Sequence, residues 1–457
     1  MRWVVTVKPD GTVKCRLVGR GYEENTESIR TDSPTCSRDT LRVLMSLVVS
    51  IGWIIQHIDV ESAFLQGKRL DRDVYIRPPL EAETDNLWKL NKCMYGLADA
   101  PRMWYTELIE TLEKLGMEVS LYDESFLFWR YNDKLRGLMG VHVDDFLNGG
   151  SLQFQKNILQ PLKEKFSLSM EVEGNFLFTG LEINQRSDCI ELSQHAYIAE
   201  LEKIVIDRER AGDNKLPISK REFKELRSVC GQLLWVSSQT RPDLSYQTCV
   251  ASNSASAATI SDLKNVNKAI DYAKKNGLTL KYPKLDLNDL NIVTFCDAAY
   301  ANLRDGSSQG AHIVFLASKN GKACALTWQS KKIKRLVKSS LSGESWAMIE
   351  AVESAELLNA MIQEITRVKD IPVICMTDCN SLYNELHTSN TIEDKGLRVP
   401  IGGLRRKVKN KEFIVKWIPK ELQLADPLTK AGAPNKELRE VLATGCLPDY
   451  ILKEVFG

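Results

Sequence analysis

The sequence has 457 residues, of which 43% are hydrophobic and 26% charged, and its formal net charge is +1. These values are ordinary for a soluble globular protein, and the length predicts about three domains of roughly 150 residues each. The chain has no internal repeats or low-complexity tracts, and the net charge alone does not indicate a polyanionic partner.

The eleven cysteines lack CxxC spacing, which predicts a reduced intracellular protein rather than a disulfide framework. Cys375 and Cys379 have no nearby histidine, so a zinc site explains them poorly. The longest apolar run, residues 43–55, is too short to span a bilayer, and no signal peptide opens the chain. We therefore expect a protein of the cytoplasm or nucleus that is not secreted and has no membrane partner.

The chain opens with two predicted strands, residues 2–8 and 12–18, around a turn at Pro9, Asp10 and Gly11. A domain that starts inside a hairpin predicts truncation, or cleavage from a longer polyprotein. Apolar residues at helical spacing then predict a helix over residues 37–51. Residues 53–59 predict a strand that ends in Asp59, where free backbone N–H groups of the next turn favour binding of a metal and a triphosphate.

Asp144 and Asp145 form a pair of carboxylates inside a β-forming stretch, with Gly149 and Gly150 behind them. The pattern predicts a hairpin whose bend carries the acids, followed by a glycine turn. An isolated Asp-Asp pair is most often a simple turn. A third acid would instead favour a divalent cation site, because Mg²⁺ prefers carboxylate and phosphate oxygens. Asp59 is the candidate for that third acid.

Residues 196–290 are mainly helical in their apolar spacing, with a turn predicted at residues 240–243. After a polar linker, strands are predicted over residues 292–300, 312–317 and 323–329. A helix follows Ser339. The side chains predicted to face inward from it are Trp346, Ile349, Val352, Leu357 and Ile362.

Four acids follow in this second half, and each has a structural explanation of its own. Asp297 ends an apolar run, and Asp378 follows the predicted strand of residues 371–377. Glu344 is predicted in the first turn of its helix, where the helix dipole favours a carboxylate. Asp426 precedes Pro427, which is the pattern of a helix cap. The spacings between the four are 47, 34 and 48 residues.

Ten short motifs, taken together, are more specific than any single acid. The strings KCRLVGRGY, HIDVESAFLQG, DVYIRPP, LWKLNKCMYGLADAPRMWY, VHVDDF, FTGLEI and LSQHAYI resemble the reverse transcriptase of copia-type LTR retrotransposons. The strings SSLSGES, MTDCNSL and QLADPLTK resemble the RNase H domain of the same elements, over residues 291–432. The chain thus looks like a fragment of a copia-type Pol polyprotein.

The resemblance implies an α+β multidomain protein, a right-hand polymerase followed by an RNase H-like α/β domain with a mixed five-stranded sheet. Residues 1–195 would form fingers and palm, with the fingers incomplete at the N-terminus. Residues 196–290 would form the thumb and connection, and residues 291–432 the RNase H-like domain. Residues 433–457 are predicted to be a short docked tail.

The resemblance also implies roles for residues of the first half. Asp59 and Asp144 would bridge two metal ions, with Asp145 in support and the Val60 carbonyl as an extra ligand. Phe64 matches the bulky side chain that excludes a nucleotide 2′-OH, although it also suits a core aromatic. The further substrate-binding candidates, each with a structural alternative as a strand, turn or helix residue, are Lys14, Arg16, Tyr95, Gly96 and Arg102.

In the second half, the resemblance implies that Asp297, Glu344, Asp378 and Asp426 form the acid set of an RNase H. Each active site would use two Mg²⁺ (or Mn²⁺) ions. The implied partners are an RNA template, a DNA primer, an RNA–DNA hybrid and dNTPs, in a cytoplasmic virus-like particle or the nucleus. The oligomeric state is not indicated.

The sequence departs from the family pattern at three places. His142 stands where many members have Tyr, and Ala98-Asp99-Ala100 replaces a frequent Lys-Gln-Ser. Gly396 and Pro400, predicted just before a helix, stand where charged residues are common. Two hypotheses follow. The chain is an active bifunctional enzyme, which the presence of all seven acids favours, or a non-catalytic remnant that binds nucleic acid without synthesis.

Overall fold

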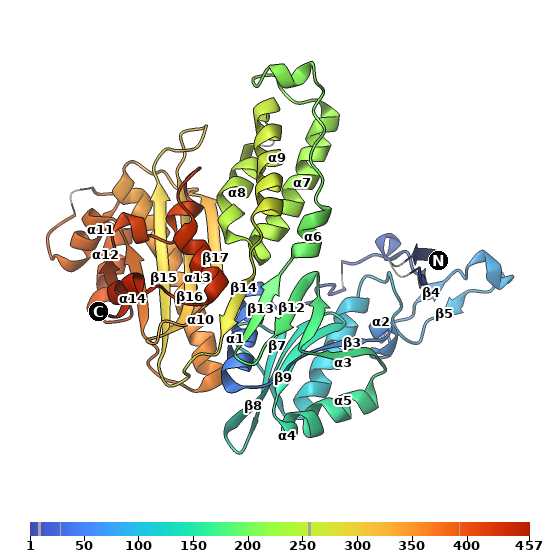
Figure 1. Cartoon of the computed structure of the whole chain (residues 1–457). Helices are drawn as coiled ribbons and strands as arrows, with labels where there is room; N and C mark the ends of the chain where they lie inside the picture. Colours follow the sequence, from blue (N-terminus) through green and yellow to red (C-terminus); the bar gives the residue numbers. More distant parts are fainter. Residues whose placement is uncertain (8–10, 28, 255–256, 393) are drawn as a thin grey trace. The chain divides into compact units, whose positions relative to one another are not determined.

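The computed structural model describes residues 1–7, 11–27, 29–254, 257–392 and 394–457, which form two compact units (Figure 1). The first unit comprises Met1–Leu44 and Ile55–Glu173, and the second Met45–Ile54 and Gly174–Gly457. Helix α1 (Arg38–Ile51), close to the predicted 37–51, begins in the first unit and ends in the second. Each unit is therefore described by itself.

A six-stranded antiparallel sheet forms the centre of the first unit, in the order β10-β3-β9-β8-β7-β6. Its strands are β3 (Ile55–Val60), β6 (Met117–Val119), β7 (Phe126–Tyr131), β8 (Lys134–His142), β9 (Asp145–Gly150) and β10 (Leu168–Glu173). Aromatic and β-branched residues suit these half-buried strands. The β8–β9 hairpin places its bend at Val143 and Asp144, as the sequence predicts.

Gly149 and Gly150, predicted to form a turn, lie instead in strand β9, and that prediction is wrong. The Phe154 ring fills the space beside Gly150, since a Cβ added there would lie 2.4 Å from the Cδ1 atom of Phe154. A Cβ added at Gly137 on β8 would lie 2.0 Å from the Cδ2 atom of the same ring. The glycines thus make room for a buried aromatic that packs the hairpin onto the core.

Helices cover this sheet and complete its core. They are α3 (Ala100–Lys114), α4 (Leu152–Phe154) and α5 (Gln160–Lys165), the last two joined by a π-helical turn over Gln155–Leu159. Trp104 and Leu108 of α3 pack with Phe146 and Phe154 in one buried cluster. Burial of such large side chains contributes about 1.5–3 kcal/mol each.

Smaller elements complete the first unit. β1 (Arg2–Val7) pairs with β2 (Val13–Val18), while Pro9 and Asp10 of the predicted turn lie outside the described residues. β4 (Tyr75–Ile76) pairs with β5 (Trp88–Lys89), and the short helix α2 (Ala63–Gln66) follows β3.

The second unit contains the mixed five-stranded sheet that the resemblance implies, in the order β17-β16-β15-β18-β19. Its strands are β15 (Leu290–Ala299), β16 (Gln309–Ser318), β17 (Ala323–Lys332), β18 (Val373–Thr377) and β19 (Ile414–Trp417). β15 pairs antiparallel with β16 and parallel with β18, so the sheet is mixed. The long helix α10 (Ser340–Thr366) packs against β15, β16 and β18.

Two predictions about α10 are wrong in detail. Glu344 lies one residue beyond the first turn, because the helix begins at Ser340 behind the Ser339 cap. Leu357 is exposed, and its neighbour Leu358 is buried in its place, while Val352 and Ile362 face inward as predicted. The true inward stripe is therefore shifted by one residue in the middle of the helix.

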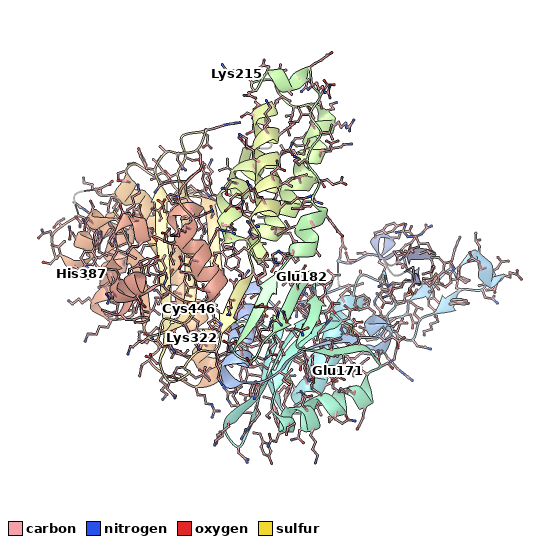
Figure 2. All side chains as sticks on the ribbon, in the orientation of Figure 1. Glu171, Glu182, Lys215, Lys322, His387 and Cys446 are labelled. Atoms are coloured by element: carbon pink, nitrogen blue, oxygen red, sulfur yellow. The ribbon has the colours of Figure 1, made fainter. Side chains whose placement is uncertain are left out.

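A helical subdomain of the same unit contains α6 (His195–Glu200), α7 (Lys220–Gln239), α8 (Ser245–Ser254) and α9 (Ile260–Lys275). It is joined to an antiparallel sheet of β11 (Asn175–Phe178), β12 (Leu181–Gln185), β13 (Cys189–Ser193) and β14 (Leu280–Pro283). β14 lies in the region predicted to be mainly helical and was missed. Glu182, labelled in Figure 2, accepts hydrogen bonds from Ser193 Oγ and the Ala196 N–H at 2.7 Å each, and so caps α6.

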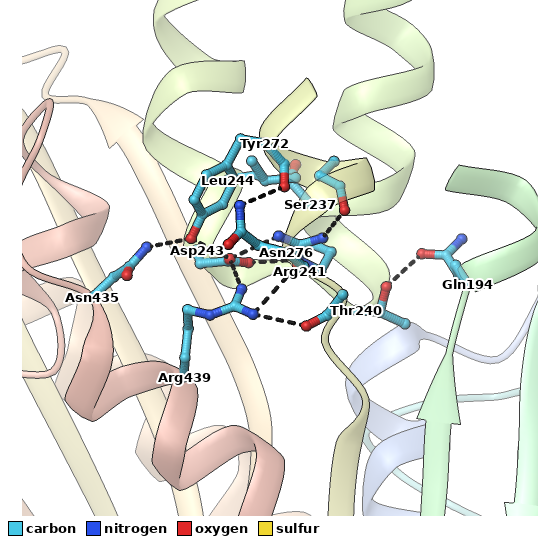
Figure 3. A network of polar contacts seen from close by, with 12 residues as sticks. Gln194, Ser237, Thr240, Arg241, Asp243, Leu244, Tyr272, Asn276, Asn435 and Arg439 are labelled. Carbon is cyan, nitrogen blue, oxygen red and sulfur yellow. Dashed lines mark hydrogen bonds and ion pairs between the residues drawn. The ribbon is translucent and has the colours of Figure 1, made fainter. Parts of the chain in front are cut away.

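The last helices are α11 (Asn380–His387), α12 (Arg398–Lys409), α13 (Lys436–Thr444) and α14 (Asp449–Phe456). Pro400 lies inside the first turn of α12, where its missing N–H costs no hydrogen bond, rather than before the helix. Arg439 of α13 bonds to Asp243, which also pairs with Arg241, as Figure 3 shows. α13 is thus anchored to the helical subdomain.

All eleven cysteines are free thiols. Cys296 and Cys375 lie in neighbouring strands with their sulfurs 3.8 Å apart. Among the described residues, no helix has the length and apolar character needed to cross a bilayer.

Candidate functional sites

The first unit brings together the three acids predicted as a metal site. Carboxylate oxygens of Asp59, Asp144 and Asp145 all lie within 4.8 Å of one another. Asp59 is on β3 and pairs in register with Asp145 at the start of β9. Asp144 lies in the bend of the hairpin, and its carbonyl accepts a hydrogen bond from the Val60 N–H at 2.9 Å.

The bend is held from outside the hairpin. Val143 has a φ of +61°, a left-handed conformation that β-branched residues rarely adopt. The Trp104 indole N–H donates a hydrogen bond of 2.7 Å to the Val143 carbonyl. Strain of this kind persists only where surrounding contacts enforce it, and it is typical of functional sites.

The electrostatics of the first cluster favour a cation. Burial raises the pKa of Asp144, and the neighbouring Asp145 and Asp59 carboxylates raise it further. All three acids are only half-buried, so solvent and ions can reach them. His57, which sequence reasoning missed, is buried with Nε2 2.7 Å from Asp145 Oδ1. Its position two residues before Asp59, on an apolar strand, was the available signal.

A cavity of about 450 Å³ opens beside Asp59 and Asp144. Lys14, Arg16, Tyr95 and Val60 line it, so it gathers four more of the predicted residues. The Arg16 guanidinium lies 5.5 Å from the centre of the Tyr95 ring. A hollow lined by both carboxylates and two cations suits a ligand that carries both phosphate groups and a metal ion.

Three other predicted residues lie elsewhere. Phe64 packs against the core, with its ring 5.1 Å from that of Tyr95. Arg102 pairs with Asp32 at 3.2 Å. Gly96 has a φ of +89°, and a Cβ there would lie 2.3 Å from the Gly19 carbonyl oxygen, so glycine is required for the contact between the two loops.

The departure at Asp99 has a structural role. Its carboxylate accepts a hydrogen bond of 2.9 Å from Arg72, and both side chains are largely buried. Arg72 also bonds to Glu24 at 2.8 Å. Asp99 therefore secures the loop in front of α3 from within.

The second unit brings together three of its four predicted acids. Oxygens of Asp297, Glu344 and Asp378 lie within 4.8 Å of one another, from the middle strand β15, helix α10 and the end of β18. Asp297 is 2% and Glu344 6% exposed. Burial raises the pKa of Glu344 well above its usual value, and Asp297 and Asp378 raise it further. Its Oε2 atom is buried and accepts no hydrogen bond.

Asp426 does not belong to that cluster of three. It begins a short 3-10 turn (Asp426–Leu428) without a side-chain capping bond, so the predicted capping role is wrong. Its carboxylate pairs with Lys430, which also lies 3.3 Å from Asp297 Oδ2. Thr429 Oγ1 donates a further hydrogen bond to Asp297. Sequence reasoning missed Thr429 and Lys430, although they follow Asp426 by three and four residues.

Both clusters have the chemistry of hard divalent cations. Mg²⁺ and Mn²⁺ prefer carboxylate oxygens, and neither cluster includes a thiol ligand. The buried, unpartnered Glu344 Oε2 is the strongest sign, because an isolated buried carboxylate is costly without a compensating charge. The residues therefore fit such ions at both places.

Comparison with known proteins gives a match for the first part of the chain. Residues 1–218 match the family model described as reverse transcriptase (RNA-dependent DNA polymerase). The chain is 29% identical over 94% of its length to the retrovirus-related Pol polyprotein from transposon RE1 of Arabidopsis thaliana. It is 25% identical over 95% of its length to that from transposon TNT 1-94 of Nicotiana tabacum. It spans only 30% and 34% of these two proteins.

Solved structures show the same fold at low identity. The foamy viral protease-reverse transcriptase dRH in complex with double-stranded DNA matches 91% of this chain and 64% of that one, with a TM-score of 0.58 and 14% identity. The same viral protein in complex with an RNA/DNA hybrid matches 94% of this chain and 51% of that one, with a TM-score of 0.50 and 13% identity.

Proposed function

We propose that this protein is an RNA-directed DNA polymerase with RNase H activity. The proposal is supported by its similarity to copia-type retrotransposon Pol polyproteins and by the match of residues 1–218 to the reverse transcriptase family. The single observation that carries the proposal is the presence of two separate three-carboxylate clusters, one in each unit. Each cluster brings together acids from separate parts of the sequence, Asp59 with the Asp144–Asp145 pair in the first unit and three separate acids in the second. Such convergence is not expected of acids scattered by chance over a surface.

We assign residues 1–195 to fingers and palm, 196–290 to thumb and connection, 291–432 to the RNase H-like domain and 433–457 to a C-terminal segment. The antiparallel sheet that carries Asp59 and the Asp144 hairpin supports the assignment of the palm. The α7–α9 bundle supports a helical thumb, and the mixed five-stranded sheet supports the RNase H-like domain.

In the first site, Asp59, Asp144 and Asp145 hold two Mg²⁺ (or Mn²⁺) ions, with the Val60 carbonyl as a further ligand. When bound, such ions lower the pKa of a primer 3′-OH and neutralise the leaving pyrophosphate. Lys14 and Arg16, which line the same cavity, bind the triphosphate of a dNTP. Tyr95 and Gly96 shape the same loop, and Phe64 packs behind Tyr95.

In the second site, Asp297, Glu344 and Asp378 hold divalent metal for hydrolysis of the RNA strand of a hybrid, with Asp426 beside them. The Oε2 atom of the buried Glu344 carboxylate has no hydrogen-bond partner among the described residues, which makes Glu344 a strong ligand candidate. Specificity for RNA comes from its 2′-OH and from the shape of the hybrid duplex.

The partners are accordingly an RNA template, a DNA primer, the resulting hybrid and dNTPs, in an intracellular setting. Contacts to the template are directed to phosphates rather than to base edges, so sequence preference is slight.

Primer extension on an RNA template with Mg²⁺ tests the first activity. The wild-type chain incorporates dNTPs, and Asp144→Asn lowers incorporation by about 10³-fold or more because it removes a metal ligand. Asp378→Asn is the matched control, since it lies in the other unit and leaves extension unchanged. Absence of incorporation by the folded wild-type chain would show a non-catalytic remnant instead.

Cleavage of a labelled RNA–DNA hybrid tests the second activity with the roles reversed. Asp378→Asn abolishes cleavage and Asp144→Asn preserves it. Loss of both activities in each variant would contradict two independent sites.

A further inference from the structure

The second acid cluster contains a positive charge of its own. The Lys430 ammonium lies 3.3 Å from Asp297 Oδ2 and is in direct contact with Asp426 Oδ1. A lysine side chain is positively charged at neutral pH, so Lys430 places a cation between these two acids.

We propose that Lys430 takes the place of one metal ion in this cluster, so that the second unit binds a single divalent cation tightly where two are implied by the resemblance. That ion is held by Asp297, Glu344 and Asp378, whereas Asp426 is neutralised by Lys430. Lys430 is then a built-in counterion.

Geometry supports this division of the four acids. Asp297, Glu344 and Asp378 offer oxygens within 4.8 Å of one another, and Asp426 is not among them. Glu344 Oε2 is buried without a hydrogen bond, so one uncompensated oxygen lies among these three acids. Asp297 Oδ2, in contrast, already accepts bonds from Thr429 and Lys430.

The segment that carries Lys430 is fixed to the sheet at several points. Gln423 Nε2 donates to the Cys296 carbonyl at 3.0 Å, and Asn302 Nδ2 donates to the Thr429 carbonyl at 2.9 Å. Ser330 Oγ bonds to the Leu428 carbonyl at 2.5 Å. Because the segment that leads to Lys430 is tied to β15, to the loop after it and to β17, the backbone keeps the Lys430 ammonium beside Asp297.

Charge explains why an ion and Lys430 exclude each other at this position. A divalent ion that bridged Asp297 and Asp426 would need oxygens within about 2.0–2.6 Å, which is the space that the ammonium occupies. Two cations there would also repel each other strongly in a buried setting. A metal ion can enter only if Lys430 leaves.

Counting bound Mn²⁺ by electron paramagnetic resonance on the full chain tests the proposal. Subtracting the count for Asp297→Asn from that for wild type isolates the second cluster, because Asp297 borders both the three-acid position and the position that Lys430 occupies, and we expect a difference of one ion. In a Lys430→Gln background, the same subtraction is expected to give two. Lys430→Arg keeps the positive charge and is expected to give one.

Lys453→Gln is the matched control, because it removes the same charge from an exposed position of α14. It is expected to leave the difference at one. A difference of two in the wild-type chain, or of one in Lys430→Gln, would overturn the proposal. The wild-type comparison does not depend on the folding of any Lys430 variant. If Asp297→Asn does not fold, the double variant Glu344→Gln with Asp426→Asn replaces it, because it removes one acid from each of the two positions.

The inference rests on the proposed function only in its consequence for cleavage, and the two can fail separately. Hybrid cleavage together with two ions in the wild-type cluster would refute the role of Lys430 and leave the nuclease intact. One ion without cleavage in any variant would refute the nuclease and leave the role of Lys430 intact.

Discussion

The two acid clusters use the same kind of side chain in opposite surroundings. Asp59, Asp144 and Asp145 are half-buried at the bend of a hairpin, beside a cavity of about 450 Å³ that Lys14 and Arg16 line. Asp297 and Glu344 are almost completely buried between the central strand and the long helix. Solvent moderates charge repulsion in the first cluster, whereas protein groups and ions must do so in the second.

The two clusters differ in the groups that compensate their negative charge. In the first cluster, His57 bonds to one acid and the cavity leaves room for a charged ligand. In the second, Lys430 and Thr429 bond directly to Asp297, and Glu344 has an oxygen without a partner. We therefore expect the second cluster to depend more strongly on metal for its stability.

The largest effect is expected for Glu344→Gln. The change removes a metal ligand, so hybrid cleavage falls by about 10³-fold or more. With a chelator present, the same variant is more stable than wild type by about 1–3 kcal/mol, because it removes a buried carboxyl group whose charged form is disfavoured by burial and by Asp297 and Asp378. Thermal unfolding with and without Mg²⁺ measures this.

Asp144→Asn in the half-buried cluster is the control for that experiment, with a smaller gain in the chelator. An equal gain in the two variants would remove the distinction between the clusters. Added Mg²⁺ is expected to stabilise wild type and not Glu344→Gln, since ligands that bind only the folded state raise its stability.

The next largest effect is a loss of stability at Asp243, a buried acid whose charge is balanced by arginines rather than by a metal ion. Asp243 and Arg241 are completely buried, and Arg439 from α13 bonds to the same carboxylate at 2.5 Å (Figure 3). Asp243→Ala leaves Arg241 buried without its partner and is expected to cost about 3–5 kcal/mol. Urea unfolding followed by circular dichroism measures the loss.

Glu225→Ala provides the matched control, because it breaks the exposed pair of Glu225 with Arg221, one turn apart on α7. Its expected cost is about 0.3–0.5 kcal/mol. The loss of stability in Asp243→Ala should be the same with and without Mg²⁺, because the charge of Asp243 is balanced by arginines and not by a metal ion. Recovery of the lost stability on addition of Mg²⁺ would contradict the hypothesis that Asp243 is balanced without metal.

The smallest effect is expected at His57, which positions Asp145 rather than contacting substrate. His57→Leu removes the hydrogen bond to Asp145 Oδ1 and is expected to slow primer extension about tenfold, or about 1.4 kcal/mol. His57→Gln retains a donor and is expected to restore most of the rate. Apparent Mg²⁺ affinity should follow the same order, while KM for the primer–template stays unchanged.

His387→Gln is the control for a histidine outside either cluster, exposed on α11 and labelled in Figure 2. It should change neither rate nor metal affinity. Equal rates in His57→Leu and wild type would show that the hydrogen bond has no part in positioning Asp145.

Much of the site could be predicted from the sequence because strands and motifs depend on short stretches of residues. An acid at the end of an apolar run predicted Asp59 and Asp378, and adjacent acids between β-formers predicted the hairpin bend at Asp144. The failures were also local in origin. The turn predicted at Gly149 and Gly150 is wrong because spacing does not reveal the Phe154 ring, which Gly150 accommodates within the strand. β14 was missed because its partner, β13, lies about ninety residues earlier.

The order of residues was enough to predict strands that carry acids at or near their ends, the mixed five-stranded sheet and the similarity to copia-type Pol polyproteins, since these depend on short-range pattern and motif. Which charge meets which acid depended on folding. His57 beside Asp145, and Lys430 between Asp297 and Asp426, arise where separate elements pack together. The balance of buried charge is a property of three-dimensional neighbours, which residue spacing alone does not encode.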